Sequence, residues 1–326
     1  MAHELEIING KGQMFSVTET PWHGLGTVVS NAPSIEDVLN LSGLNWSVEL
    51  QPTFLADGTE TKQKAIVRDS DKSILGYVGD RYRPLQNTEA LSFFEKFHTS
   101  GLVDFETAGS LRNGQRIWIM AKFKENSEVA ITKNDTVRKY LLLSNGHDGV
   151  MGIRVGFTPI RVVCANTLAA AHNEDGEANK LISVFHTKNT MQNLEAIRDI
   201  INTTNQSFEA TVEQYKAMAK KQIKKDHLAR YVDIVFYNSK QAETDREKLM
   251  RENMTENITR LFEYGHGNQD QDVRGSVWAL YNGVTQYLSY EAGRSSDTRL
   301  NNLWFGTAKN VNQKAFDTAM KIVVAA

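Results

Sequence analysis

Cysteine and proline are both scarce in this chain of 326 residues. Cys164 is the only cysteine, and there are five prolines. A single cysteine excludes an internal disulfide framework and a zinc site built from several cysteines. It is typical of a protein that works in a reducing cytoplasm, which is where we expect this one. Five prolines leave little room for a proline-rich linker.

Long apolar runs and a strong excess of one charge are also lacking. No window reaches the roughly 18 continuous apolar residues that a membrane helix needs. The first residues show no basic stretch followed by an apolar run, so we expect no signal peptide. Charged residues make up 23% of the chain and the formal net charge is −2. This balance argues against a disordered tail and against a globally basic nucleic-acid-binding protein.

Motifs for nucleotide binding and for catalysis are missing as well. The chain has neither a Gly-x-x-x-x-Gly-Lys-Ser/Thr loop nor a Gly-x-Gly-x-x-Gly after a strand, which argues against an ATP-driven recombinase or helicase. Cys164 with His147 or His172 would supply a nucleophile and a base. Cys164 ends an apolar run, however, which favours a buried structural thiol. The histidines are scattered, and only His23 and the pair His147-Asp148 are candidates for a metal site. We therefore predict no catalytic residue, no metal and no cofactor.

The spacing of apolar residues changes near residue 190. Before it, short apolar runs alternate with turn residues, and after it apolar residues recur at helical spacing. This pattern predicts an α+β fold. We expect an antiparallel sheet with flanking helices in the N-terminal half and a helical C-terminal half. The two regions are 1–189 and 190–326, with the second packed on the first or continuous with it.

The clearest local signal is a hairpin centred on Asn113-Gly114, because Asn-Gly suits the positive φ of a type I′ turn. Strands are expected on either side, at 103–112 and 115–124. Asp57-Gly58 indicates another turn. Further strands are predicted at 46–55, 65–68, 74–78, 137–144, 151–157 and 160–163, and helices at 34–39 and 87–98.

The second half is predicted to begin with one long helix at 191–225. Its apolar seam steps by three and four residues, as in a coiled coil. We favour an ordinary helix that packs on its own domain, and the alternative is a subunit-contact helix in a homo-oligomer. Later helices are expected at 244–264, where Thr244 and Glu247 have capping-box spacing, and at 273–291 and 307–324.

Basic residues are concentrated in the middle of the chain. Nine Lys or Arg stand against four acids between Leu111 and Ala165. Strand alternation places several of them, with Trp118, on one sheet face. Cations that follow phosphates and a ring that stacks on bases are typical of single-stranded DNA binding. The alternative is a solvated face of a half-exposed sheet. The candidate nucleic-acid-binding residues are Arg112, Arg116, Trp118, Lys122, Lys124, Arg138, Lys139, Arg154 and Arg161.

Four motifs in this order resemble one family, the phage/plasmid-like proteins grouped as a domain of unknown function. They are Pro21-Trp22-His23-Gly24-Leu25-Gly26, Arg161-Val162-Val163-Cys164-Ala165-Asn166-Thr167, the Trp278-x-x-Tyr-Asn282-x-Val-Thr-x-Tyr run, and Phe305-Gly306-Thr307-Ala308-Lys309-Asn310 followed by Lys314. The resemblance implies a setting in mobile DNA inside a bacterial host cell, without a reaction. The aromatic motif residues are expected mainly in the core, with Trp22 also a candidate for base stacking or partner contact.

These observations leave three functions open. The leading one is ATP-independent single-stranded DNA binding, in the manner of an annealing-type recombination factor. The second is a protein-interaction factor that inhibits or redirects a host system. The third is an enzyme whose site is assembled from dispersed residues. If the sheet face does not bind DNA, the alternative location is the lysine-rich stretch of Lys220, Lys221, Lys224 and Lys225.

Overall fold

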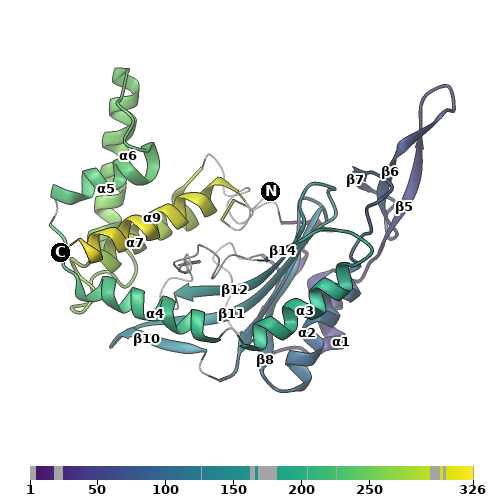
Figure 1. Ribbon diagram of the computed structural model, residues 1–326, viewed down its shortest axis with the longest axis horizontal. Coiled ribbons are helices and arrows are strands. Elements are labelled where there is room, and N and C mark those ends of the chain that lie inside the picture. Colours follow the sequence, from purple (N-terminus) through teal and green to yellow (C-terminus); the bar gives the residue numbers. More distant parts are fainter. Residues whose placement is uncertain are drawn as a thin grey trace. The chain divides into compact units, whose positions relative to one another are not determined.

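The computed structural model describes residues 5–17, 25–125, 127–161, 166–167, 182–203, 205–224, 226–293, 302–303 and 306–325 (Figure 1). Its contacts divide the chain into two compact units that are interleaved along the sequence. Unit 1 consists of Met1–Asn126, Tyr140–Phe157 and Lys180–Asn205, and unit 2 of Ser127–Lys139, Thr158–Asn179 and Gln206–Ala326. The boundary expected near residue 190 stays a prediction.

Unit 1 contains a mainly antiparallel sheet. Its strands run in the order β12-β11-β9-β8-β3-β4, with β14 on β12. The pairs β3–β8, β8–β9, β9–β11 and β12–β14 are antiparallel, and β3–β4 is parallel. A short hairpin precedes the sheet. The bounds are β1 Ile7–Ile8, β2 Lys11–Gly12, β3 Met14–Val17, β4 Thr27–Val29, β8 Val103–Leu111, β9 Arg116–Phe123, β11 Asp135–Gly146, β12 Ile153–Arg161 and β14 Ile182–Val184.

Three helices share one apolar core with this sheet: α1 (Ile35–Ser42), α2 (Asn87–Thr99) and α3 (Thr190–Thr203). Side chains from the helices, among them Phe94, meet the inward residues of the strands, among them Ile119. The core therefore joins the N-terminal helices to a helix about a hundred residues further along the chain.

The predicted Asn113-Gly114 hairpin is confirmed. Asn113 and Gly114 have φ angles of 53° and 85°, and the amide of Gln115 donates to the carbonyl of Arg112 at 3.2 Å. Positive φ is strained for most residues but common for Asn and free for Gly, which is why this dipeptide turns the chain here.

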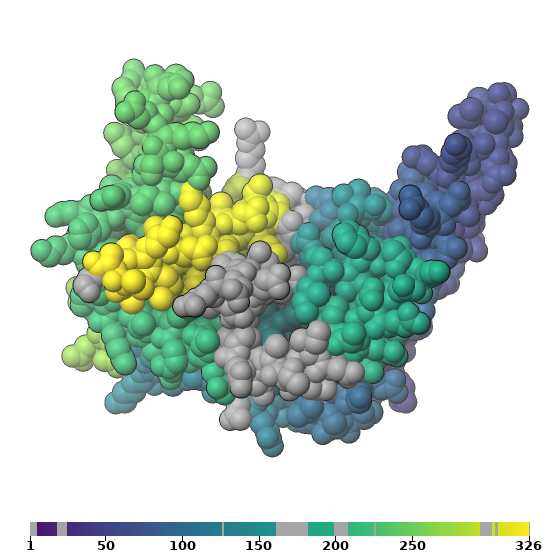
Figure 2. Space-filling view, viewed as in Figure 1, coloured from purple at the N-terminus to yellow at the C-terminus, as the bar shows by residue number. Residues whose placement is uncertain are grey.

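A second sheet in unit 1 is built from β5 (Val48–Phe54), β6 (Glu60–Arg68) and β7 (Ile74–Val78), all antiparallel. The β5–β6 ribbon extends away from the rest of unit 1 (Figures 1 and 2). Its turn contains Gly58 with φ of 85°, as the Asp-Gly signal predicted. Phe54 and Leu55 lie near its tip and are each 58% exposed.

Unit 2 is mainly helical. Among the described residues no strand follows residue 240, so the α+β prediction is confirmed. Two short strands pair with the parts of β11 and β12 that belong to this unit. The bounds are β10 Glu128–Thr132, β13 Asn166–Thr167, α4 Asn205–Lys220, α5 Asp226–Tyr237, α6 Asp245–Tyr264, α7 Val277–Gln286, the π-helical η2 Tyr287–Glu291 and α9 Thr307–Val324. No described helix is long and apolar enough to cross a membrane.

The end predicted for the long helix at 191–225 is wrong, because α4 ends at Lys220. The described helical residues are those of α3 and α4, and residue 204 between them lies outside the described part. The predicted seam divides accordingly. Leu194 belongs to the core of unit 1, and Tyr215 packs against Trp278 in unit 2 with ring centroids 4.9 Å apart. The apolar seam residues whose side chains the structure describes are therefore buried within the chain, as in the favoured interpretation, whereas Gln222 is exposed. A homo-oligomer stays a prediction.

The core of unit 2 is aromatic and centres on α7, every residue of which is buried. Tyr215 also meets the ring of Phe316 at 5.8 Å, and Tyr281 meets it at 5.9 Å. The motif run beginning at Trp278 therefore packs in the core, as expected. Helix α6 begins with the predicted capping box, in which the Thr244 hydroxyl accepts from the Glu247 amide.

Candidate nucleic-acid interface

The predicted alternation along β9 is confirmed. Ile117, Ile119 and Ala121 are part of the apolar core of unit 1, and Phe123 packs against it. The register therefore agrees with the sequence pattern, because strand side chains alternate between the two faces of a sheet.

The predicted exposure of Trp118 is wrong. Trp118 is 1% exposed, which is no more than Ile117 on the opposite face. On the same face as Trp118, Met120 of β9 and Tyr140 and Leu142 of β11 are buried as well. The prediction assumed a sheet with one solvated face, but here both faces are covered. Trp118 is accordingly unavailable to stack on a base.

Arg116 lies at the end of this face in an ion pair with Asp148. Its Nε and Nη2 atoms lie 3.0 Å from Asp148 Oδ2, while Oδ1 accepts the amides of Val150 and Met151. Burial opposes ionisation of Asp148, but the two amides and Arg116 together hold its pKa below the usual value. Burial, and then the charge of Arg116, lower the pKa of Arg154. The charge of Arg116 therefore acts on Asp148 and on a second predicted arginine, Arg154.

Three other predicted cations of unit 1 remain accessible. Arg112 is exposed and Lys122 is half-buried. Lys124 is 44% exposed and pairs with Asp104 at 3.0 Å. These side chains are suited to contacts with phosphates but lack an exposed aromatic residue of β9 between them.

The remaining predicted cations belong to unit 2. Arg138 pairs with Glu128 at 2.5 Å. Lys139 is 3% exposed, and its Nζ lies 5.1 Å from the centre of the Phe208 ring. Burial lowers the pKa of Lys139 to about 8, against the opposing charge of Glu209. Lys139 as a phosphate contact is therefore a wrong prediction. The side chain of Arg161 lies outside the described residues.

The motif residues that the structure describes have structural contacts. Trp278 Nε1 donates to Asp135 Oδ2 at 2.7 Å. Asn282 is fully buried and donates to the carbonyl of Trp278 at 2.8 Å. Lys314 Nζ donates to Asn238 Oδ1. Trp22 and His23 lie outside the described residues.

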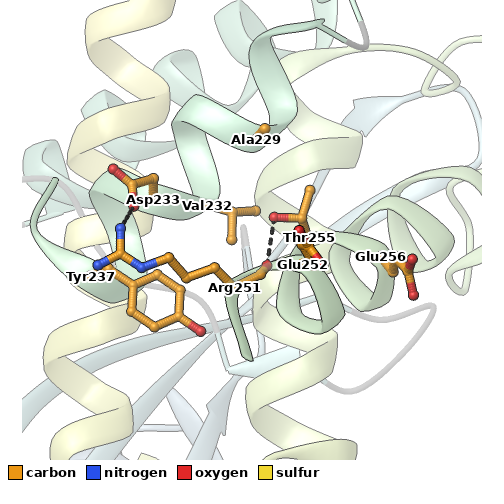
Figure 3. Close-up of a pocket in the computed structure, with 8 residues that line it drawn as sticks. All are labelled: Ala229, Val232, Asp233, Tyr237, Arg251, Glu252, Thr255 and Glu256. Atoms are coloured by element: carbon orange, nitrogen blue, oxygen red, sulfur yellow. Dashed lines mark hydrogen bonds and ion pairs between the residues drawn. The ribbon is translucent and has the colours of Figure 1, made fainter. Parts of the chain in front are cut away.

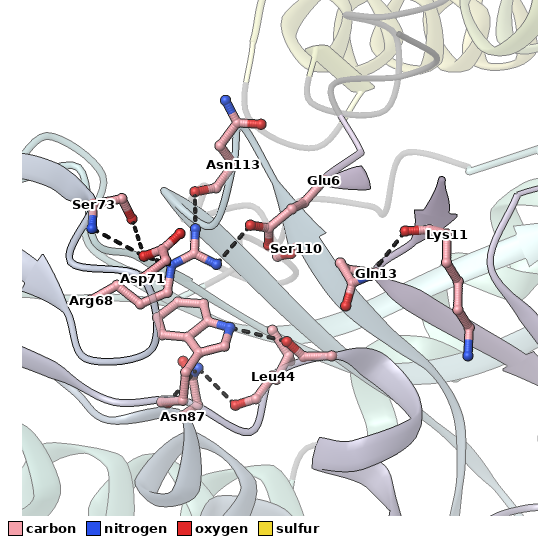
Figure 4. A network of polar contacts seen from close by, with 12 residues as sticks. Glu6, Lys11, Gln13, Leu44, Arg68, Asp71, Ser73, Asn87, Ser110 and Asn113 are labelled. Atoms are coloured by element: carbon pink, nitrogen blue, oxygen red, sulfur yellow. Dashed lines mark hydrogen bonds and ion pairs between the residues drawn. The ribbon is translucent and has the colours of Figure 1, made fainter. Parts of the chain in front are cut away.

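A buried polar network in unit 1 was not indicated by the sequence (Figure 4). Arg68 donates to Glu6 Oε1 at 2.7 Å and to the carbonyl of Asn113 at 2.6 Å. Its guanidinium lies 4.8 Å from the centre of the Trp46 ring, and Ser110 donates to the other oxygen of Glu6. The partners are 62 and 45 residues from Arg68 in the sequence, so no local spacing predicts them.

Two buried histidines lie near the same network. His147 Nε2 is 3.1 Å from Asn87 Oδ1, and His186 Nε2 is 2.7 Å from Asn145 Oδ1. Burial lowers the pKa of His147 to about 3 and that of His186 to about 4. Both rings are therefore neutral near pH 7. Among the described residues no group of His, Cys, Asp and Glu suits a metal ion; Cys164, His172 and His23 are outside that part of the chain.

The lysine segment, here Lys220, Lys221 and Lys224, forms the other basic feature. Residues 221–223, which follow α4, pair with residues 275–277 at the start of α7. The Ile223 amide donates to the Gly275 carbonyl at 2.9 Å, and the Val277 amide donates to the Lys221 carbonyl at 2.8 Å. Lys220 and Lys224 are exposed and Lys221 is half-buried. Residues 221–223 are thus held against residues 275–277, while Lys220 is the last residue of α4.

Comparison with protein families gives one result. The model of a family described as a domain of unknown function (DUF932) matches residues 74–313, which is more than half of the chain. The chain belongs to this family. The match includes β7 to α7 and most of the candidate residues, and the family description assigns no activity to them. Comparisons with curated proteins and with solved structures found no match.

Proposed function

We propose that this DUF932 protein binds single-stranded DNA without ATP, as an annealing-type factor in phage or plasmid DNA metabolism. In this proposal the lysine segment makes the principal phosphate contacts, in place of the β9 face. Lysine contacts with phosphates carry no sequence information, so binding is independent of base sequence. The phage or plasmid setting rests on the motif resemblance, and the independence from ATP rests on the missing ATP-binding motifs.

The observation that carries the proposal is the pairing of residues 221–223 with residues 275–277, beside the lysines of the segment. An antiparallel bridge joins Gln222 to Ser276. Lys224 and Arg274 lie within two residues of this bridge in the sequence, and both are exposed. A phosphate bound there would be attracted to both charges.

The charges around the segment favour an anionic partner. The lysines of the segment form no ion pair within the described part of the chain. Asp226, Asp270 and Asp272 lie on the same two stretches and offset part of the positive charge. Each phosphate contact releases a counterion, so binding supported by this segment is salt-dependent.

The test is a salt titration of a fluorescent single-stranded oligonucleotide of fixed sequence, followed by anisotropy. Lys220→Glu with Lys224→Glu should weaken binding and reduce the salt slope by about 0.7 for each phosphate that the variant no longer neutralises. The matched control is Lys62→Glu with Lys96→Glu, two exposed lysines of unit 1. A third variant, Lys122→Glu with Lys124→Glu, tests the β9 face.

Three outcomes contradict the proposal. Wild-type protein without salt-dependent binding excludes DNA binding altogether. Equal loss of affinity in the control and in the lysine segment variant means that only the overall charge matters. A loss confined to Lys122→Glu with Lys124→Glu moves the site to β9.

A second candidate function is supported by the β5–β6 ribbon. Phe54 and Leu55 are large apolar side chains exposed near its tip, and exposed apolar residues at one place are typical of protein-interaction sites. If DNA binding fails, the protein-interaction factor becomes the leading function. Phe54→Ser with Leu55→Ser would then abolish the effect on the host system without loss of folding.

A further inference from the structure

Helices α5 and α6 of unit 2 form the walls of a groove (Figure 3). It consists of two hollows of about 400 and about 650 Å³, and Tyr237 and Arg251 line both of them. Arg251 crosses between the helices, because it donates to Asp233 of α5 at 2.6 Å and lies 4.7 Å from the centre of the Tyr237 ring. This bridge fixes the width of the groove at its middle.

The lining of the groove is acidic. Five carboxylates stand against two cations, Arg251 and Lys240. Some of these charged groups already have partners in the structure. Asp233 pairs with Arg251, and Glu247 accepts hydrogen bonds from the amides of Glu243 and Thr244 at the start of α6.

Two residues on the α6 wall, Glu252 and Glu256, are exposed, and their carboxylates have no ion pair or hydrogen bond to any described residue. They stand four residues apart on one helix, where like charges repel. A cation bound between them would remove this repulsion. The net negative charge also makes the groove unsuitable for DNA, so it is distinct from the lysine segment.

Apolar side chains form the rest of the surface. Ala229 and Val232 of α5 line one hollow, and Met250 of α6 lines the other. Met250, Met254 and Ile258 are spaced by four residues on α6, and only Ile258 is buried; Met250 is 53% exposed.

We propose that this groove binds a cationic amphipathic helix of a partner protein. The apolar face of such a helix would lie on Ala229 and Val232, and its Lys or Arg side chains would pair with Glu252 and Glu256, which line the same hollow. Amphipathic helices bind in apolar grooves through residues at helical spacing. The choice of a cationic helix follows from the charge of the groove.

The probe is a labelled helical peptide of leucine and lysine, with leucine on one face, measured by anisotropy at low protein concentration. A peptide of leucine and glutamate with the same pattern is the charge control. The wild-type protein should bind the lysine peptide and not the glutamate peptide. Glu252→Lys with Glu256→Lys should weaken binding by about tenfold or more, and Glu252→Gln with Glu256→Gln should have an intermediate effect.

The matched control variant is Glu36→Lys with Glu95→Lys, two exposed acids on helices of unit 1. It should change the affinity by less than about twofold, because it leaves the groove intact. Equal binding by the wild type and the Glu252 and Glu256 variant overturns the proposal, as does equal loss in the control. Ala229→Lys provides an independent check, since this exposed residue lines the groove and a cation there should also weaken binding.

Discussion

The interiors of the two units use different chemistry. Unit 1 buries an arginine against Glu6 and keeps two neutral histidines in hydrogen bonds. Unit 2 is held mainly by rings around Tyr215, Trp278 and Phe316. A buried ion pair depends on both partners being present, whereas an aromatic core depends on volume and packing. Different substitutions and different pH values should therefore destabilise the two units.

The largest expected effect is in unit 1. Arg68→Met would leave Glu6 buried without its cation, which costs about 3–5 kcal/mol of unfolding free energy. Hydrogen exchange in denaturant would show the loss in β6 and β8 and not in α7. Arg81→Met at an exposed position is the control, with an expected change within about 0.5 kcal/mol. The double variant Arg68→Met with Glu6→Gln should recover much of the loss, and equal destabilisation of α7 would contradict the comparison.

Acidic pH should lower the stability of unit 1 more than that of unit 2. The pKa of His147 is about 3 and that of His186 about 4, both lowered by burial from 6.5. At a pH between these values and 6.5, both histidines are protonated in the unfolded chain but neutral in folded unit 1. The stability of unit 1 is therefore full above pH 6.5 and falls as the pH falls towards 4, by about 1.4 kcal/mol per pH unit for each histidine.

Chemical denaturation between pH 7 and pH 5 measures this dependence. His186→Gln should reduce the slope for unit 1. His266→Gln, at an exposed position of unit 2, should leave it unchanged. A slope that persists in His186→Gln would assign the acid sensitivity to other groups.

A smaller effect is expected in the aromatic core of unit 2. Trp278→Phe removes ring volume and the hydrogen bond to Asp135, and should cost about 2 kcal/mol. Tyr281→Phe keeps the ring and loses the hydroxyl that donates to Asn312, with an expected cost of about 1 kcal/mol. The measurement is exchange protection of α7. Equal costs for the two variants would mean that volume does not control this core.

The smallest effect concerns Lys139 in unit 2, at alkaline pH. Its pKa of about 8 lies below the usual 10.5 because of burial. Between these values the unfolded chain keeps a proton that the folded unit releases, so the contribution of Lys139 to stability increases with pH. Lys139→Met should remove this increase, a difference of about 1.5 kcal/mol between about pH 8 and about pH 9.5. Lys240→Met, at an exposed lysine, should retain it.

Local signals predicted the elements that depend on a few neighbouring residues. Asn113-Gly114 turns the chain because of its φ angles, and the Thr244 capping box begins α6. Helix α9 has the predicted bounds, Thr307–Val324. Helix α5 was missed, because its 12 residues follow a lysine-rich stretch that continues the helical spacing before it.

The sequence by itself determined the α+β class, the register of β9 and most element positions, because turns, caps and alternation act over a few residues. Only the tertiary structure decided which faces are covered. Trp118 and Lys139 are buried, although their neighbours in sequence are typical of a half-exposed sheet. Burial depends on what packs against a strand from far along the chain, and the pairing of Arg68 with Glu6 arises in the same way.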